Sequence, residues 1–87
     1  MDIDERIYFN NLTNYKPKGI KNIIYPEIRD EITYLSVKIR NTAREALSEE
    51  ISPNNAKKEI SDLLNNIKKL DIENVNKLKK IKKEGKK

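Results

Sequence analysis

Apolar residues recur at helical spacing through most of the chain. From Pro26 onward they stand three or four residues apart, which places them on one face of a helix: Ile28, Ile32, Leu35, Ile39, Ala43, Ala46 and Leu47. Pro26 suits the first position of a helix, where its missing N–H is not needed. No glycine or further proline interrupts before Pro53. The pattern predicts a long amphipathic helix over residues 26–51.

A second start signal follows at Ser52-Pro53, a serine cap before a proline. The apolar stripe behind it has the alternating four- and three-residue spacing of a coiled-coil seam: Ala56, Ile60, Leu63, Ile67 and Leu70. It predicts a helix over residues 53–83. Asp71 and Asn74 interrupt the stripe, so the helix either continues through them or gives way to a separate terminal helix capped by Asp71.

The first 15 residues carry two competing signals. Asp2 with Glu5 three residues later is a capping-box pattern that starts a helix. Against it, Ile7-Tyr8-Phe9 favours a strand, and the asparagines that follow disfavour a long helix. We expect a short helix here, or else an irregular aromatic segment. Lys16-Pro17-Lys18-Gly19 reads as a turn, and residues 20–25 as an apolar connector against the core.

These elements predict an all-α protein in which two long amphipathic helices form a helical hairpin or bundle. A chain of 87 residues allows one domain. We expect that domain to cover residues 1–81 and to leave residues 82–87 as a frayed basic tail. The N-terminal segment lacks the clean alternating strand of ribbon-helix-helix DNA binders, and both long helices exceed the usual lengths in that class.

The apolar seam predicts association. It can pair with the chain's own first long helix or with another chain, and hydrophobic residues make up only 36% of the sequence. Two helices alone bury little area per residue, which favours a homo-oligomer and a protein partner. The expected interface residues are Ile28, Ile32, Leu35, Ile39, Ile60, Leu63, Ile67 and Leu70.

Charge is unevenly placed along the chain. Residues 1–73 carry 12 lysines and arginines against 13 acidic residues, whereas residues 74–87 carry seven lysines against Glu84 alone. Such a run either binds phosphates or only solubilises the protein. The residues expected to contact nucleic acid are Lys77, Lys79, Lys80, Lys82 and Lys83. A basic face running to this end through Lys57, Lys58, Lys68 and Lys69 would favour nucleic-acid binding.

All five aromatic residues lie before residue 35, interleaved with lysines. They could form a stacking platform for single-stranded nucleic acid. The more ordinary interpretation, which we favour, is that the rings pack the N-terminal segment over the helices, because two helices leave open faces that large rings cover.

Composition excludes most catalytic chemistry. The chain has no histidine or cysteine, the usual general base, nucleophile and metal ligands, and its two glycines cannot build a phosphate loop. We therefore expect that the protein is not an enzyme and that it binds no cofactor, metal or small-molecule substrate. No apolar run is long enough to span a bilayer, so no membrane role is expected, and the acidic N-terminus is unlike a secretion signal. A cytoplasmic protein is predicted.

Two functions fit these observations. The first is a small non-enzymatic protein-interaction module that oligomerises through its helix faces, such as a regulator or accessory subunit from a mobile element. The second is a nucleic-acid-binding accessory protein that grips phosphates through its lysine-rich C-terminal helix. Lacking arginine at that end, such a protein would position nucleic acid without reading its sequence.

Overall fold

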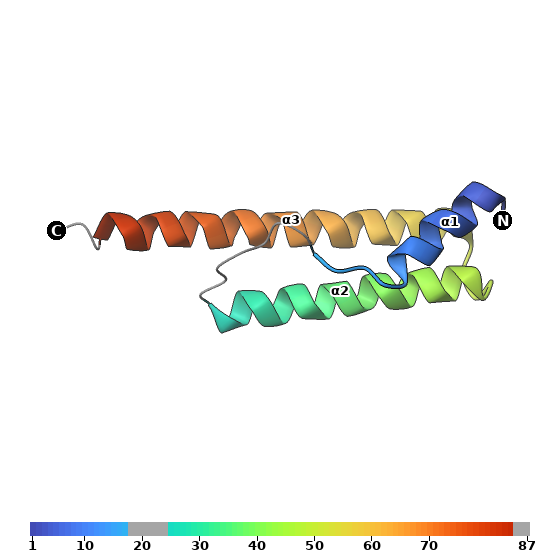
Figure 1. Ribbon diagram of the computed structural model, residues 1–87, viewed down its shortest axis with the longest axis horizontal. Coiled ribbons are helices and arrows are strands. Elements are labelled where there is room, and N and C mark those ends of the chain that lie inside the picture. Colours follow the sequence, from blue (N-terminus) through green and yellow to red (C-terminus); the bar gives the residue numbers. More distant parts are fainter. Residues whose placement is uncertain (18–24, 85–87) are drawn as a thin grey trace.

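The computed structural model describes residues 1–17 and 25–84, with side chains described up to residue 80. Three helices form the described part: α1 (Ile3–Leu12), α2 (Pro26–Leu47) and α3 (Pro53–Glu84). The long pair, α2 and α3, lie antiparallel as a hairpin, and α1 packs beside it near the closed end (Figure 1). The predicted all-α hairpin with a short N-terminal helix is confirmed.

The core lies where the two apolar stripes meet. The α2 stripe buries Ile28, Ile32, Leu35 and Ile39 against Ile60, Leu63 and Ile67 of α3, and Ile39 and Ile60 are fully buried. Small residues, Ala43, Ala46 and Ala56, occupy the closed end. Complete burial of a large aliphatic side chain stabilises the fold by about 1.5–3 kcal/mol, so this seam outweighs every exposed polar contact in the molecule.

The corner between the long helices is a Schellman motif, which ends α2 earlier than predicted. Glu49 has a φ of 61°. The N–H of Glu50 donates to the carbonyl of Glu45 at 2.9 Å, and that of Glu49 to Ala46 at 3.1 Å. The helix therefore stops at Leu47, four residues before the expected Ile51. The apolar pattern alone could not predict this stop, because glycine usually occupies the left-handed position.

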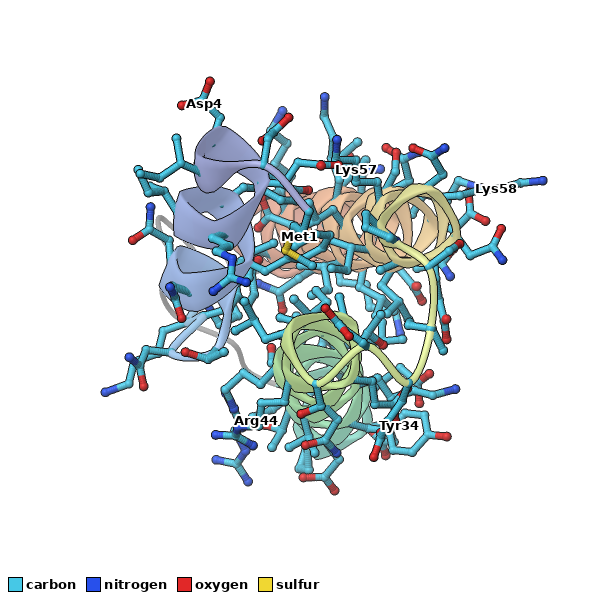
Figure 2. The ribbon with its side chains drawn as sticks, turned by 90° about the vertical axis from the view of Figure 1, so that its right-hand side faces the viewer. Met1, Asp4, Tyr34, Arg44, Lys57 and Lys58 are labelled. Carbon is cyan, nitrogen blue, oxygen red and sulfur yellow. The ribbon has the colours of Figure 1, made fainter. Side chains whose placement is uncertain are left out.

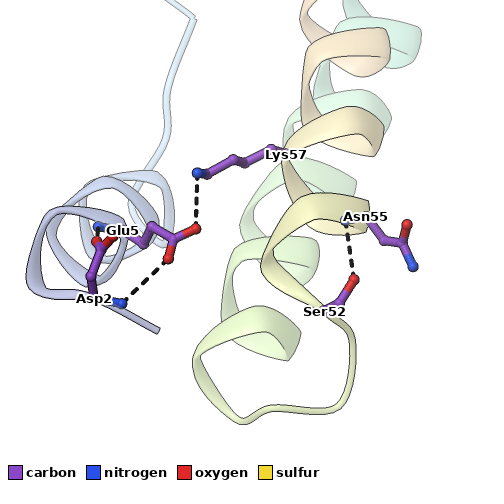
Figure 3. Close-up of polar contacts among 5 residues, drawn as sticks. All are labelled: Asp2, Glu5, Ser52, Asn55 and Lys57. Atoms are coloured by element: carbon purple, nitrogen blue, oxygen red, sulfur yellow. Dashed lines mark hydrogen bonds and ion pairs between the residues drawn. The ribbon is translucent and has the colours of Figure 1, made fainter.

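The side-chain caps predicted at Asp2 and Ser52 are confirmed, and α2 begins at Pro26 as predicted. The Asp2 side chain accepts from the Glu5 N–H at 2.8 Å while the Glu5 side chain accepts from the Asp2 N–H at 3.3 Å, completing a capping box. At the start of α3, the Ser52 hydroxyl accepts from the Asn55 N–H at 3.2 Å (Figure 3). Helix α3 runs without a break through Asp71 and Asn74, so no separate terminal helix forms.

Residues 18–24, which include most of the predicted turn and connector, lie outside the described residues. Helix α3 continues to Glu84, past the predicted domain boundary at Ile81, and residues 85–87 are likewise outside. The division into a domain and a tail stays a prediction.

We predict that Glu49→Gly stabilises the fold. Glycine removes the steric cost of the left-handed conformation, which is about 1 kcal/mol for a residue with a Cβ atom. The midpoint of urea unfolding should rise with an unchanged slope. The control is Glu50→Gly, one residue outside the left-handed position, which should leave stability unchanged or lower it. An equal effect of the two substitutions would contradict the explanation.

Candidate nucleic-acid interface on helix α3

Six lysines line the side of α3 that faces away from α2. They form three adjacent pairs, each eleven residues after the last, and all six are exposed. Eleven residues make about three helical turns with a drift of about 20°, so the pairs return to nearly the same side. We call this surface the lysine face: Lys57, Lys58, Lys68, Lys69, Lys79 and Lys80.

Viewed from the closed end of the hairpin, Lys57 and Lys58 extend outward from α3, away from α2 (Figure 2). Helical periodicity gives the later pairs corresponding directions, which makes two parallel lines of ammonium groups. The positions between the lines are all exposed and none is acidic: Asn54, Ser61, Asn65, Ile72 and Asn76. Asp62 and Glu73 lie along the outer border only. Anionic ligands can therefore approach the lysine face without meeting a carboxylate between the two lines.

One member of the face is already paired. The Lys57 ammonium lies 2.9 Å from Glu5 of α1 (Figure 3). The hydrogen bond from Lys57 lowers the pKa of Glu5, helped by the backbone N–H of Asp2, and the same bond raises the pKa of Lys57. This contact joins α1 to α3 and reduces the positive charge of the lysine face at the closed end.

The lysines predicted to contact nucleic acid do not all lie on the same surface. Lys79 and Lys80 belong to the lysine face, whereas the Lys77 ammonium lies 4.5 Å from the centre of the Tyr25 ring and 3.4 Å from Glu73. Lys77 thus packs against the start of α2. The side chains of Lys82 and Lys83 are outside the described residues. Two of the five predicted lysines are therefore placed on one exposed surface.

A basic face through Lys57, Lys58, Lys68 and Lys69 would favour nucleic-acid binding, and these four lysines do form one face with Lys79 and Lys80. The eleven-residue repeat itself was missed. Its signal is an apolar residue followed by two lysines, at Ala56, Ile67 and Leu78. The seven-residue period that describes the apolar seam does not bring out this repeat.

The residues predicted as an interface lie in the chain's own core. Seven of the eight are buried between α2 and α3, and Leu70 is half-buried. Pairing within the chain was one of the two arrangements that the seam allowed. Contact of these residues with a second copy stays a prediction.

Most of the aromatic residues serve packing. Phe9 is completely buried, and Tyr15 and Tyr25 pack partly buried against the same core. Tyr8 and Tyr34 are exposed, but Tyr34 is on α2, where the Lys38 ammonium lies 5.3 Å from its ring centre. Helix α3 contains no aromatic residue. Tyr8 is exposed on α1 near Lys57, whose pKa it helps to raise, and along α3 itself no ring accompanies the lysine face.

Two arginines of α2 hold the end of α1 in place. Arg40 donates to the Tyr15 carbonyl at 2.9 Å, and Arg44 to the Thr13 carbonyl at 3.4 Å. Helix α1 has no basic residue in its own last turn. The arginines supply the positive charge and the donors that a helix C-terminus favours, and they leave these two guanidinium groups engaged away from α3.

Asn74 occupies the centre of the apolar face of α3. It is 1% exposed, and its side-chain oxygen accepts no hydrogen bond among the described residues. The polarity of asparagine favours an exposed position, although one buried asparagine can set the register of a helix pair, and Asn74 is the buried one here. An unpaired buried amide oxygen costs roughly 1–3 kcal/mol, so Asn74 marks a weak point of the seam near the start of α2.

No family model, curated protein or solved structure matches this chain. None of the helices described between residues 3 and 84 is long and apolar enough to cross a membrane. In the described ranges, no three acidic side chains converge as metal ligands would.

The Glu5–Lys57 pair predicts a specific acid sensitivity. Because the folded-state pKa of Glu5 is lowered, its contribution to stability is present above the pKa of the unfolded chain and is lost as the pH falls through the folded value. Glu5→Gln should therefore flatten the decline of the unfolding midpoint between about pH 5 and pH 3. Asp4→Asn, next to Glu5 but outside the ion pair, is the control and should leave that decline intact.

Proposed function

We propose that this chain is a non-enzymatic nucleic-acid-binding accessory protein, acting in the cytoplasm, which holds the phosphate backbone through the lysine face of α3. The observation that carries the proposal is the alignment of six exposed lysines with no acidic residue between them. Lysine is a point-charge ligand for phosphate, and neutralising phosphates releases counterions, which drives binding.

The placement of the lysines on α3 supports a binding surface that extends beyond the C-terminal lysine run. The basic residues of α3 begin at Lys57 and continue to the helix end, so they do not depend on the last few residues. Residues 53–73 carry four lysines and four acidic residues, so the net positive charge of the chain comes from residues 74–87, while the lysine face gathers positive charge on one side of α3. Extended single-sign surfaces steer anionic ligands and raise association rates.

We predict that two double substitutions weaken nucleic-acid binding independently: Lys68→Gln with Lys69→Gln, and Lys79→Gln with Lys80→Gln. Each removes up to two phosphate contacts and should make the slope of log affinity against log salt shallower by up to about 1.8 for a duplex. Fluorescence anisotropy with labelled DNA between about 50 and 200 mM salt measures both quantities.

The charge-matched control is Arg6→Gln with Lys38→Gln. These residues are exposed on α1 and α2, away from the lysine face, and the variant loses the same two charges. It should keep nearly all the affinity and slope of the native chain. Equal losses of affinity in all three variants would show that binding depends on net charge and not on the lysine face. Absence of binding by the native chain at about 50 mM salt would overturn the proposal.

A second function, self-association or docking on a protein partner, is favoured by a different observation. Helix α1 turns Phe9 and Leu12 inward, yet its outer side carries Ile3 and Ile7, which are 74% and 54% exposed. Met1 and Tyr8, at 38% and 39%, lie in the same segment. Exposed apolar residues gathered on one short helix are typical of contact surfaces.

We predict that Ile3→Asn with Ile7→Asn leaves the hairpin folded and abolishes any oligomer seen for the native chain. Both side chains point away from the core, so the unfolding midpoint should change little. Light scattering at micromolar concentration gives the mass. Val37→Asn, an exposed change on α2, is the control. A native chain that is already monomeric would contradict the homo-oligomer.

A further inference from the structure

We infer that the ligand of the lysine face is double-stranded DNA, bound without regard to sequence and lying alongside α3. The inference rests on the proposed function and names the class of nucleic acid. Two independent features carry it: the chemistry that the face lacks, and the spacing of its lysine pairs.

Proteins that bind single strands combine a basic groove with aromatic rings on which bases stack. Helix α3 has no aromatic residue, and Phe9, Tyr15 and Tyr25 are engaged in the core. Tyr8 is the exposed ring near the lysine face, beside Lys57 at the closed end, and from Lys58 to Lys80 the face offers phosphate contacts but no ring on which an unpaired base could stack. Its partner is therefore a nucleic acid that presents phosphates on the outside and keeps its bases stacked among themselves, which is a duplex.

Base reading is absent as well. Helix α3 has no arginine, the side chain that binds guanine edges bidentately, and no glutamine. The asparagines between the two lysine lines, Asn54, Asn65 and Asn76, carry an amide that can pair with adenine, but on a helix that lies along the backbone they donate to phosphate oxygens as the lysines do. A face of lysine, asparagine and serine, with Ile72 as its one apolar residue, fixes a helix on the backbone but does not select a sequence.

The spacing of the pairs fits the period of B-form DNA. Eleven residues of α-helix rise about 16.5 Å, so Lys58 and Lys80 are about 33 Å apart along the axis. One turn of B-DNA spans about 34 Å. A straight helix beside the duplex meets the same strand once per turn and the opposite strand in between. Lys58, Lys69 and Lys80 can therefore contact three successive backbone crossings.

The shape of the molecule permits this approach. The chain extends 58 Å along its long axis and only 20 and 18 Å across it. Helix α3 forms one long edge of this rod, and α2 and α1 lie to other sides of it (Figures 1 and 2). Nothing described projects over the lysine face along its length, although the Glu5–Lys57 pair lowers its charge at the closed end.

The first test uses the full native chain with a duplex and with either of its single strands, all labelled and of equal length. The duplex should bind roughly tenfold more tightly at about 100 mM salt. Its salt slope should grow with duplex length up to about one turn, roughly 10 base pairs, because a shorter duplex cannot reach all three pairs. Equal affinity for single strand and duplex would overturn the inference while leaving phosphate binding standing.

The second test changes the spacing but not the charge. A variant with Ser61→Lys, Asn65→Lys, Lys68→Ser and Lys69→Asn moves the middle pair toward the closed end on the same exposed side. Duplex affinity should fall about tenfold, while single-strand affinity stays within about twofold, since a flexible strand follows any spacing. Undiminished duplex affinity in a variant with native helicity would overturn the inference.

Should that variant fail to fold, the length dependence with the native chain still decides. A further change, Asp62→Asn, removes an acidic group from the border of the face and should tighten duplex binding about twofold or more. Failure of the proposed function looks different from failure of this inference, because in the former case neither duplex nor single strand binds the native chain at about 50 mM salt.

Discussion

Everything in this molecule depends on the contact between two apolar stripes. Helices α2 and α3 each carry a stripe of large aliphatic residues on one side, and together they enclose these stripes, whereas Val37 and Ile72 stay exposed on other sides. A single helix of either sequence would be marginal in water, since helices draw most of their stability from packing of an apolar face. Once the stripes meet, the opposite side of α3 is committed to solvent. The placement of the lysines thus follows from the burial of Ile60, Leu63 and Ile67.

The corner sets the register of that contact. Five residues separate Leu47 from Pro53, and the Schellman hydrogen bonds fix how the chain leaves α2. The serine cap then fixes how it enters α3. With the corner fixed, the position at which α2 begins determines which part of α3 is covered. The Lys77 ammonium over the Tyr25 ring marks the place where α2 begins beside α3.

Much of the fold could be predicted from the sequence because its signals are local. Helical periodicity places Ile39 and Ile60 in the core. The helix starts are marked by Asp2, Pro26 and Ser52. The end of α2 could not be predicted, because Glu49 adopts a conformation that its residue type does not announce. Nor could the burial of Asn74, which follows from its place on the seam rather than from its polarity. Site prediction was weaker still. The high density of lysines near the C-terminus is visible in the sequence. Lys58 and Lys69 belong to the same surface because of their eleven-residue spacing, which places them on the same side of the chain only when it is helical.

Helix α3 has ten residues more than α2, and this difference has a consequence for how the protein opens. The excess lies past Tyr25, where Figure 1 shows α3 extending beyond the start of α2. Residues in this overhang lack the cover of a partner helix, and several of them are lysines that repel one another at helical spacing. Backbone amides there should therefore exchange their hydrogens by local opening, at a much lower free energy than amides beside the buried seam. A polyanion laid along the overhang would relieve the repulsion and protect those amides. Binding and helix order at this end are thus thermodynamically linked, and the overhang is the part of the fold whose stability a ligand controls.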